Sequence, residues 1–191
     1  FTQPNCGVKV ARILHLMRLA LILVLFGFGV ANSASAQEDL LSVFGTVKHE
    51  QSNKKLQDVR VVVYQDGVEF DAITTDARGG YGFDLPLRHN YTFSFELSAH
   101  GNKRIEVDAS GIPLGVKGAR NMDLDMSMMP LPPGFDASIF EEPYGRGEYS
   151  AEQNTVIFDS NYTVRMRNKV NAELARAGGA GGGSRKNEGE V

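Results

Sequence analysis

The sequence predicts an all-β protein: a seven-stranded antiparallel β-sandwich followed by a small C-terminal hairpin and helix. Three observations predict this class. From Leu41 to Met129, apolar residues alternate with polar or small ones, which is the period of a half-buried strand. Turn signals interrupt the pattern at intervals of about ten residues, as in sandwiches of two sheets. No helical stretch separates the strands, which excludes a parallel sheet built with crossover helices.

Composition and charge limit the function. The 191-residue chain is 42% hydrophobic and 23% charged, ordinary values for one globular domain with appendages. Its net charge is −3. If the N-terminal segment with Lys9, Arg12 and Arg18 is removed, 23 acidic and 17 basic residues remain, a net charge of −6. This acidic balance argues against nucleic acid as a partner.

An export signal is predicted over residues 1–36. Arg18 supplies positive charge, Leu19–Ala31 is almost wholly apolar, and small residues ending at Ala36 form a cleavage site. The alternative is an uncleaved anchor, but the apolar run is shorter than the roughly 20 residues that span a bilayer. We therefore expect an exported protein, periplasmic or extracellular, that meets the membrane only through its transient signal peptide.

Cleavage before Gln37 would leave a mature chain without cysteine. Cys6 is the only cysteine, and it precedes both Gln37 and Met17, the expected start of translation. The mature chain is thus predicted to have no disulfide, no cysteine nucleophile and no lipid on an N-terminal cysteine.

The predicted domain covers residues 37–129, and most of its strands have one clear face. The strand after Asp66-Gly67 is the exception, because Phe70 and Ile73 fall on opposite faces. In the other strands, the residues that share a face are Val43, Gly45 and Val47; Val59, Val61 and Val63; Tyr81, Phe83 and Leu85; Tyr91, Phe93, Phe95 and Leu97; Ile105 and Val107; and Met122, Leu124, Met126 and Met128.

The stretch from Thr74 to Phe83 is predicted to be the middle hairpin of the sandwich. Asp76 suits the first position of a type I turn, where its carboxylate accepts backbone hydrogen bonds. Gly79 is expected at positive φ, closing the turn before Tyr81 and Phe83 enter the next strand. Asp76, Gly79, Tyr81 and Phe83 are therefore assigned a structural role.

Four motifs occur in order: Gly45-x-Val47, Leu56-x-x-Val59-x-Val61-x-Val63, Thr75-Asp76-x-x-Gly79-x-Tyr81-x-Phe83, and an aromatic strand from Tyr91. Together they resemble the carboxypeptidase regulatory-like domain, also called transthyretin-like or prealbumin-like, over residues 41 to 129. The resemblance implies an Ig-like or prealbumin-like sandwich with an accessory role and no catalytic residues. Such domains accompany metallopeptidases, outer-membrane receptor barrels, and surface or polysaccharide-handling proteins.

Residues 130–177 are predicted to form a proline-rich linker, a hairpin across Ala151–Asn154, and a helix that ends near Ala177. The remaining residues, 178–191, have the composition of a disordered Gly-rich tail. The helix carries an apolar row that needs a surface to cover, and docking against the sandwich is favoured over docking on a partner. This possible interaction helix presents Tyr162, Met166, Val170 and Leu174.

Three sets of residues are candidate metal ligands, and each has a structural explanation. His49, His89 and His100 stand apart in the sequence, in polar turns. The carboxylates, which could ligate calcium, follow no helix-loop-helix spacing and include an exposed acidic stripe; they are Asp123 and Asp125 with Asp76, Asp84 or Asp108. The methionines, which could bind copper, share the phase of Leu124 and are expected to pack in the core; they are Met122, Met126, Met128 and Met129. No metal or cofactor is predicted.

Catalysis is disfavoured, because no Gly-x-Ser-x-Gly elbow is present and a small sandwich rarely encloses a dry cleft. We expect a non-catalytic module for protein interaction or envelope scaffolding, bound to an envelope protein. The alternative is a carbohydrate-binding module, with Tyr64 and Phe70 stacking on a polysaccharide if they face outward. Exposed coplanar rings would favour the alternative, and a groove or apolar patch near the helix would favour protein interaction.

The first prediction concerns processing. The protein recovered from its producing cell should begin at Gln37, because export removes the charged and apolar segment with its cleavage site. Intact-mass spectrometry checks this. A mature chain that keeps Leu19–Ala31 would contradict both the signal peptide and the expected location.

Overall fold

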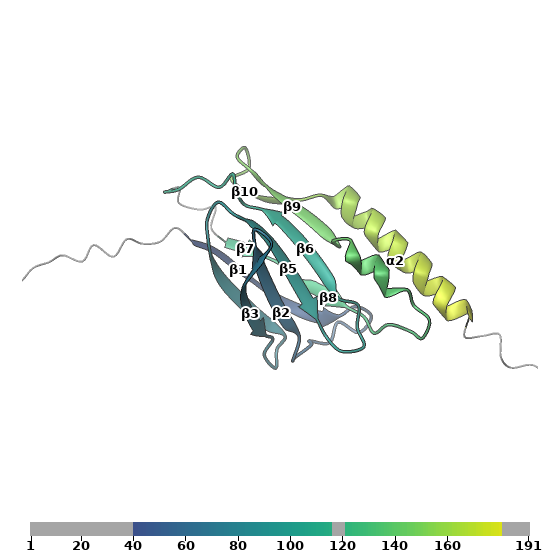
Figure 1. Cartoon of the computed structure of the whole chain (residues 1–191). Coiled ribbons are helices and arrows are strands. Elements are labelled where there is room, and N and C mark those ends of the chain that lie inside the picture. The colour runs from purple at the N-terminus through teal and green to yellow at the C-terminus, as the bar shows by residue number, and fades with distance from the viewer. Residues whose placement is uncertain (1–39, 116–120, 181–191) are drawn as a thin grey trace, which may run out of the picture. The chain divides into compact units, whose positions relative to one another are not determined.

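A computed structural model describes residues 40–115 and 121–180 of the chain (Figure 1). Both ranges belong to the unit Glu38–Val191. The predicted signal peptide, Cys6 and residues 181–191 lie outside the described residues. The elements are β1 (Leu40–His49), β2 (Arg60–Gln65), β3 (Val68–Thr74), β4 (Gly80–Pro86), β5 (Asn90–Glu96), β6 (Lys103–Asp108), β7 (Asn121–Asp123), β8 (Met126–Met128), the 3-10 helix η1 (Ala137–Glu141), β9 (Gly145–Ser150), β10 (Thr155–Phe158) and α2 (Ser160–Ala180).

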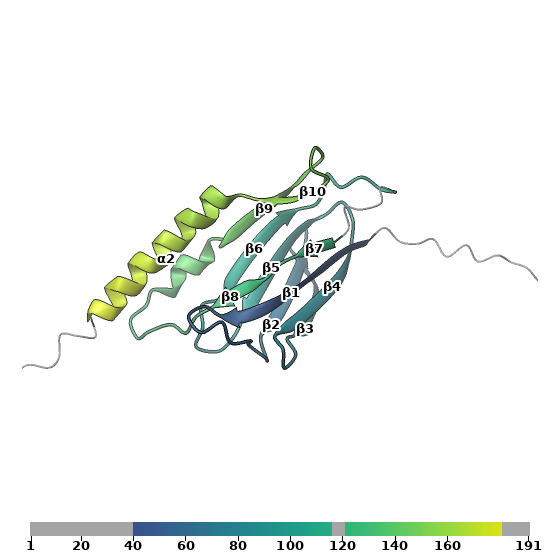
Figure 2. The ribbon, with the colours of Figure 1, turned by 180° about the vertical axis from the view of Figure 1, so that it is seen from behind.

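Two sheets form the sandwich, which confirms the predicted fold class. The smaller sheet has the order β4-β1-β7, with β8 also paired to β1, and the larger has the order β10-β9-β6-β5-β2-β3. Figures 1 and 2 view them from opposite sides, with the larger sheet nearer the viewer in Figure 1. The pairing is not wholly antiparallel as predicted: β1 is parallel to β7 and β8, and β6 is parallel to β9.

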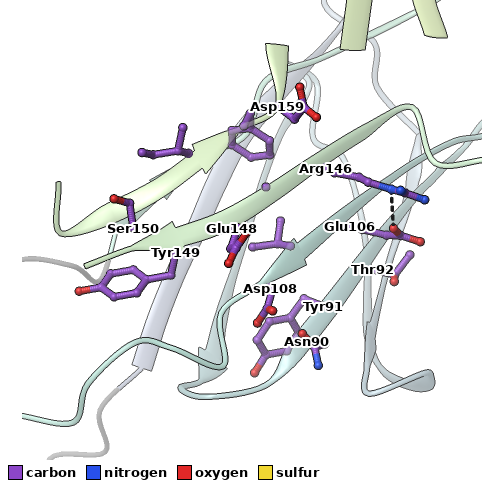
Figure 3. A pocket seen from close by; sticks show the side chains of 14 residues that line it. Asn90, Tyr91, Thr92, Glu106, Asp108, Arg146, Glu148, Tyr149, Ser150 and Asp159 are labelled. Carbon is purple, nitrogen blue, oxygen red and sulfur yellow. Dashed lines mark ion pairs between the residues drawn. The ribbon is translucent and has the colours of Figure 1, made fainter. Parts of the chain in front are cut away.

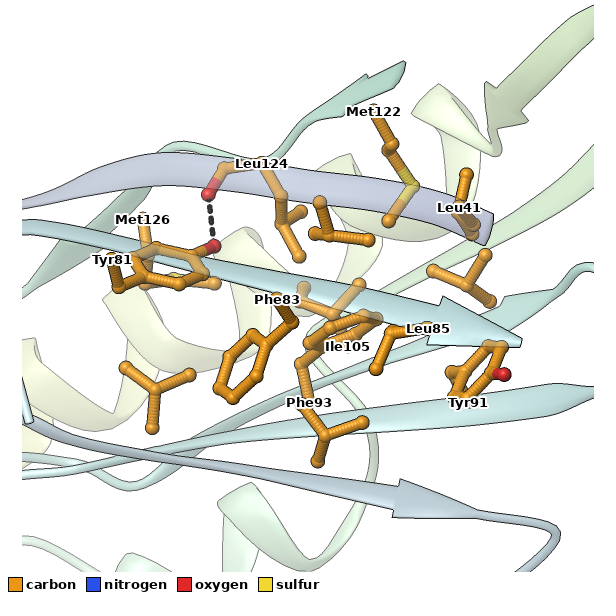
Figure 4. Close-up of a cluster of buried hydrophobic side chains, with 14 of the residues drawn as sticks. Leu41, Tyr81, Phe83, Leu85, Tyr91, Phe93, Ile105, Met122, Leu124 and Met126 are labelled. Atoms are coloured by element: carbon orange, nitrogen blue, oxygen red, sulfur yellow. Dashed lines mark hydrogen bonds between the residues drawn. The ribbon is translucent and has the colours of Figure 1, made fainter. Parts of the chain in front are cut away.

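The core follows the predicted alternation. The predicted faces of β1, β2 and β4–β8 are buried apart from Gly45 and Leu97, which are half-buried, and the aromatic rings contact one another between the sheets (Figure 4). Tyr81 and Phe95 meet edge to face with centroids 5.5 Å apart. Met122, Met126, Met128 and Met129 are all buried, which confirms the prediction that they pack in the core.

The last predicted strand is divided into β7 and β8 because the chain crosses directly over Gly45. A Cβ on Gly45 would lie 2.3 Å from the Leu124 carbonyl oxygen, so only glycine fits there. Leu124 N–H donates to the Phe44 carbonyl at 2.8 Å, and the buried Tyr81 hydroxyl donates to the Leu124 carbonyl (Figure 4). Gly45 and Tyr81 are partners across β1 and β4. Residues from two of the predicted motifs therefore contact the same carbonyl group, that of Leu124.

The predicted hairpin from Thr74 to Phe83 is wrong as a pairing, because β3 and β4 belong to different sheets. The turn itself connects the two layers. Asp76 Oδ1 accepts from the backbone N–H groups of Arg78 and Gly80, both at 2.8 Å. Gly79 has φ +71° and its carbonyl accepts from Val47 N–H, which fixes the turn to β1.

Thr75, beside this turn, is a buried polar residue that sequence reasoning did not single out. Its hydroxyl accepts from Val59 N–H at 3.0 Å and donates to the Leu56 carbonyl at 2.8 Å. These two bonds satisfy backbone groups in the segment just before β2, where an unpaired buried group would be costly.

The segment after the sandwich is built onto the larger sheet. β9 pairs with β6, and β9 and β10 form the predicted hairpin. The Asp159 carboxylate accepts from Tyr162 N–H at 2.9 Å and caps α2. The helix continues beyond the predicted end at Ala177, through Gly178 to Ala180, because glycine lowers helix stability by only about 1 kcal/mol and does not forbid the conformation.

Within the described ranges, no helix is long and apolar enough to cross a membrane.

A second small hydrophobic core stabilises this C-terminal segment. Met129, Phe140 and, from α2, Val170 form a buried cluster. Leu131, Phe135, Ile139, Tyr144 and Leu174 pack around it.

The second prediction concerns Gly79. Gly79→Ala should destabilise the protein by more than about 1–2 kcal/mol, because an added Cβ meets positive φ and also lies 2.5 Å from the Val47 carbonyl oxygen. Gly67→Ala is the matched control, since Gly67 has φ +84° with no atom within 4 Å of the added Cβ. Urea unfolding measures both. Equal losses would show that the contact with β1 contributes nothing.

Candidate functional site

The predicted interaction helix has its apolar row turned inward, while Val164, outside that row, is exposed. Met166 and Val170 are only 1% and 2% exposed, and Leu174 is half-buried. The Tyr162 hydroxyl donates to the Pro143 carbonyl at 2.8 Å. Two polar contacts fix the same side of α2: Lys169 pairs with Glu142, and Asp136 N–H donates to Glu173. This row therefore covers η1 and the linker and leaves little apolar surface for another molecule.

The predicted turn residues lie in the frame of the sandwich. Asp76 and Gly79 form the connection between the sheets, while Tyr81 and Phe83 lie in the core. Burial, with the nearby charges of Asp125 and Asp123, raises the pKa of the Tyr81 hydroxyl above its usual value. A neutral hydroxyl that donates to a buried carbonyl is a structural group.

The histidines do not converge. His49 Nδ1 accepts from the Gln51 and Ser52 N–H groups, and His100 Nδ1 lies 2.9 Å from the Ser98 carbonyl. His89 Nδ1 lies 2.6 Å from Asp66 Oδ2. Across residues 40–115 and 121–180, no three His, Cys, Asp or Glu side chains group as a metal site requires.

The candidate calcium ligands are also separate, and most have protein partners. Asp84 accepts from the Ser42 hydroxyl, and Asp108 accepts from Ser110 N–H. Asp125 lies in the break between β7 and β8, where it pairs with Lys48 at 2.8 Å and accepts from both Thr46 N–H and the Thr46 hydroxyl. Asp125 thus substitutes for the strand partner that β1 lacks at the crossing over Gly45.

The outer face of the larger sheet carries an open trough of about 870 Å³ (Figure 3). Side chains from β5, β6, β9 and β10 line it, and acidic groups dominate: Glu106, Asp108, Glu148 and Asp159. Its one guanidinium, Arg146, pairs with Glu106 at 3.1 Å and lies 4.6 Å from the Tyr162 ring centroid. No serine or threonine in the trough is paired with a histidine base, so the lining does not form a nucleophilic site.

A second hollow of about 700 Å³ adjoins the trough at Thr92 and extends toward β2 and η1. Tyr64, Arg104 and Phe140 line it, and Phe140 packs directly over Gly101. Tyr64 is half-buried, whereas Phe70 is exposed on the neighbouring strand β3. The two rings proposed for sugar stacking thus differ in exposure.

Lys103 is a buried cation that sequence reasoning missed. Its side chain is 2% exposed, and its ammonium donates to Glu50 Oε2 at 3.1 Å and to the Ser127 carbonyl at 2.7 Å. It also lies 4.1 Å from the Tyr144 ring centroid. Burial lowers the pKa of the ammonium, and the Glu50 carboxylate opposes that shift. The alternation alone could have indicated its burial, since Lys103 is in phase with the buried residues Ile105 and Val107.

A hollow of about 430 Å³ adjoins this lysine, lined by Asp123, Asp125 and Arg167 among others. Because the contacts of Lys103 with Glu50, Ser127 and Tyr144 occupy its donors, the ammonium is not free for a ligand. The contacts indicate a structural junction.

The free edge of β3 brings three exposed apolar residues together on one strand, whereas Phe44, Leu114, Ile157 and Val164 are exposed singly on other segments. All seven residues of β3 are exposed, with Val68 at 71%, Phe70 at 48% and Ile73 at 39%. In the described part of the chain, β3 pairs only with β2, and the register shifts by one residue between Val63 and Tyr64. β3 lies at the margin of the larger sheet in Figures 1 and 2. Unpaired backbone groups and apolar side chains therefore lie together.

Comparisons with known proteins give structural similarities alone. No protein-family model and no curated protein matches the sequence. Similar solved structures include the Bacillus anthracis TIE protein (14% identity, TM-score 0.40, 48% of this chain and 17% of that one). A C-terminal fragment of the pilus adhesin SpaC from Lactobacillus rhamnosus GG is 16% identical (TM-score 0.36, 49% and 46%).

A third similar structure is a putative carbohydrate binding protein from Bacteroides uniformis, at 15% identity (TM-score 0.33, 47% of this chain and 41% of that one). The chain spans less than half the length of each of these three structures. At these identities and scores, the similarities assign neither a family nor a function.

The third prediction concerns Asp125 and acid stability. Hydrogen bonds from Lys48 and Thr46 lower the pKa of the Asp125 carboxyl from 3.8 to about 2. The lowered pKa means that the folded state favours the charged form, so this stabilisation is present above about pH 4 and is lost as the pH falls toward 2. Asp125→Asn should therefore lower stability at neutral pH and reduce the acid-dependent loss.

Chemical unfolding at several pH values measures this, with Asp123→Asn as the neighbouring control. Asp66, Asp76, Asp136 and Glu173 also have lowered pKa values, so part of the acid dependence should remain in the variant. An unchanged pH profile in Asp125→Asn would contradict the role given to the contacts with Lys48 and Thr46.

Proposed function

We propose that this chain is a non-catalytic exported module that binds a protein partner of the cell envelope through the edge of β3. The observation that carries the proposal is the exposure of Val68, Phe70 and Ile73 on a strand with a free edge. Apolar side chains next to unpaired strand groups suit another polypeptide, which can cover both at once.

The other surfaces fit protein binding less well. The apolar row of α2 is already covered by η1 and the linker. The trough carries four carboxylates in its lining, and its guanidinium, Arg146, is already paired with Glu106. β4 is also an edge, but its alternate residues are buried and its exposed positions are Gly82 and Asp84. This comparison favours β3 as the partner surface.

Export rests on residues 1–36, whose charged, apolar and small-residue segments have the order of a signal peptide. An accessory, non-catalytic role also agrees with the resemblance of residues 41 to 129 to the carboxypeptidase regulatory-like domain. In this proposal the domain supplies a binding edge, and the β9–α2 segment completes the larger sheet and stabilises it.

The second candidate function is polysaccharide binding. The trough and the hollow beside it adjoin at Thr92, and polar side chains with the Tyr64 ring line them. Hydroxyl-rich ligands use such donors and acceptors together with an aromatic face. A retarded band in gels that contain a soluble polysaccharide, lost in Tyr64→Ala, would favour this function over the first.

The fourth prediction tests the proposed surface with a photo-crosslinking amino acid at position 68. We expect a discrete crosslinked species in the native cell envelope, because Val68 is the most exposed of the three apolar side chains on β3. Val164 is the matched control, an exposed valine on α2 at 42% exposure. Gel shift and mass spectrometry of the product identify the partner.

A crosslink from position 68 that is absent from position 164 would support the proposal. Equal products from both positions would indicate non-specific collision and contradict it. No product at position 68 would also contradict it.

A further inference from the structure

We infer that β3 binds an extended segment of its partner as an added strand, and that Asp71 selects a segment with a lysine or arginine facing it. This inference rests on the proposed function and names the chemistry of the partner. It follows from the backbone of β3, the side chains beside it and the charges along the edge.

The backbone of β3 has an outward donor. Along an antiparallel edge strand, alternate residues direct their N–H and C=O groups toward the paired strand and toward the free side. Ala72 N–H donates to the carboxylate of Asp71 at 2.7 Å. Because Thr75 N–H donates to the Val59 carbonyl, Ile73 and Asp71 direct their backbone groups toward β2 in this register, and Ala72 directs its groups away from β2. This donor therefore lies on the free side, in the position that an added strand would use.

Asp71 protects this edge while it is unoccupied. Its carboxylate satisfies Ala72 N–H, and the register shift near Phe70 interrupts regular pairing. Carboxylates and bulges at an edge are common protections against indiscriminate strand pairing. An added strand would replace the Asp71 oxygen at Ala72 N–H with its own carbonyl, and the released carboxylate would need a new partner.

The charges indicate which partner. β3 contains Glu69 and Asp71 and no basic residue. Arg60 already pairs with Glu69 at 3.1 Å and with Glu96 at 3.0 Å. Asp71 pairs with no cation among the described residues. A basic side chain on the added strand would therefore satisfy the one unmatched charge of this edge.

The same charges disfavour a second copy of this chain. Two β3 strands placed edge to edge would add the acidic residues of a second copy and no basic one, so Asp71 would gain no cation, and like charges placed across a pair of strands are destabilising. The edge thus combines attraction for a basic segment with repulsion of its own copy, which is how specificity against unwanted partners is obtained. Val68, Phe70 and Ile73 would contact apolar parts of the added strand, including the aliphatic stem of a basic residue beside Ile73, which shares the face of Asp71.

The fifth prediction is tested with a labelled peptide, acetyl-Thr-Lys-Val-Lys-Val-Lys-Thr-amide, titrated with the full chain. Fluorescence anisotropy should show saturable binding. A peptide with glutamate in place of lysine should bind at least tenfold more weakly, and so should the lysine peptide N-methylated at alternate residues, because it cannot complete the ladder. Asp71→Lys should reverse the preference between lysine and glutamate peptides.

Asp123→Lys is the control, because it makes the same change in net charge on β7, in the other sheet. Asp71→Asn is a second variant that keeps the shape of the side chain, and it should weaken the lysine peptide without favouring the glutamate peptide. Equal effects of Asp71→Lys and Asp123→Lys would mean general electrostatic attraction and overturn the inference. Undiminished binding of the N-methylated peptide would overturn strand addition.

Sedimentation velocity tests the second copy as occupant. The wild-type chain should remain a monomer, and a wild-type dimer whose stability changes in Asp71→Lys would overturn the choice of a basic partner. The crosslinking result separates the two proposals. If position 68 crosslinks a partner while the peptides show no preference, the inference fails and the proposed function stands. If position 68 gives no crosslink, the proposed function fails, whatever the peptides show.

Discussion

The buried ammonium of Lys103 is the contact on which the arrangement of the sheets depends. It lies in β6 of the larger sheet and donates to the Ser127 carbonyl in β8 of the smaller sheet. It also pairs with Glu50, directly after β1, and faces the ring of Tyr144, directly before β9. Removing any one partner of a buried charge leaves it uncompensated, at a cost of several kcal/mol. One side chain therefore ties both sheets and the C-terminal segment into a single packing arrangement.

This junction determines which surfaces remain available. Because Tyr144 is held beside Lys103, β9 follows in register with β6, and β10 then closes that side of the larger sheet. The helix that follows covers η1 and the linker with Val170 and Leu174. The apolar row of α2, which the sequence predicted as the interaction surface, therefore packs inside the fold. The free edge of β3, with its exposed apolar residues, lies at the other end of the larger sheet.

Alternation in the sequence predicted the strands and their faces, because successive side chains of a strand point to opposite faces and only the apolar ones favour the core. It placed the aromatic residues of β5 and the methionines of β7 and β8 correctly. It did not predict which strands pair or in which direction, since those follow from contacts between distant segments. The parallel pairing of β1 with β7 and β8 depends on the crossing over Gly45, which needs the position of Leu124 to be known.

The candidate surface was hard to predict for the same reason. Phe70 and Ile73 gave β3 two conflicting faces, and the structure explains the conflict: β3 is an edge strand whose residues are exposed on both faces. Lys103 followed the apolar phase of its strand but was polar, so the pattern alone did not indicate that Glu50, Ser127 and Tyr144 would surround it. Residues that depart from the alternation thus lie both at the Lys103 junction and on the proposed binding edge.

The free edges of the two sheets differ in how they are protected, and this difference gives β3 its role. β7 and β10 are only three and four residues long, so they offer little backbone for pairing. β4 is longer but has glycines and a terminal proline, which weaken it as a template. β3 has seven exposed residues and relies on a register shift and the Asp71 carboxylate. A short strand or a proline blocks every partner, whereas a charge blocks only strands that cannot match it. An edge guarded by a register shift and one carboxylate therefore suits the proposed selection of a basic strand over a second copy of the chain.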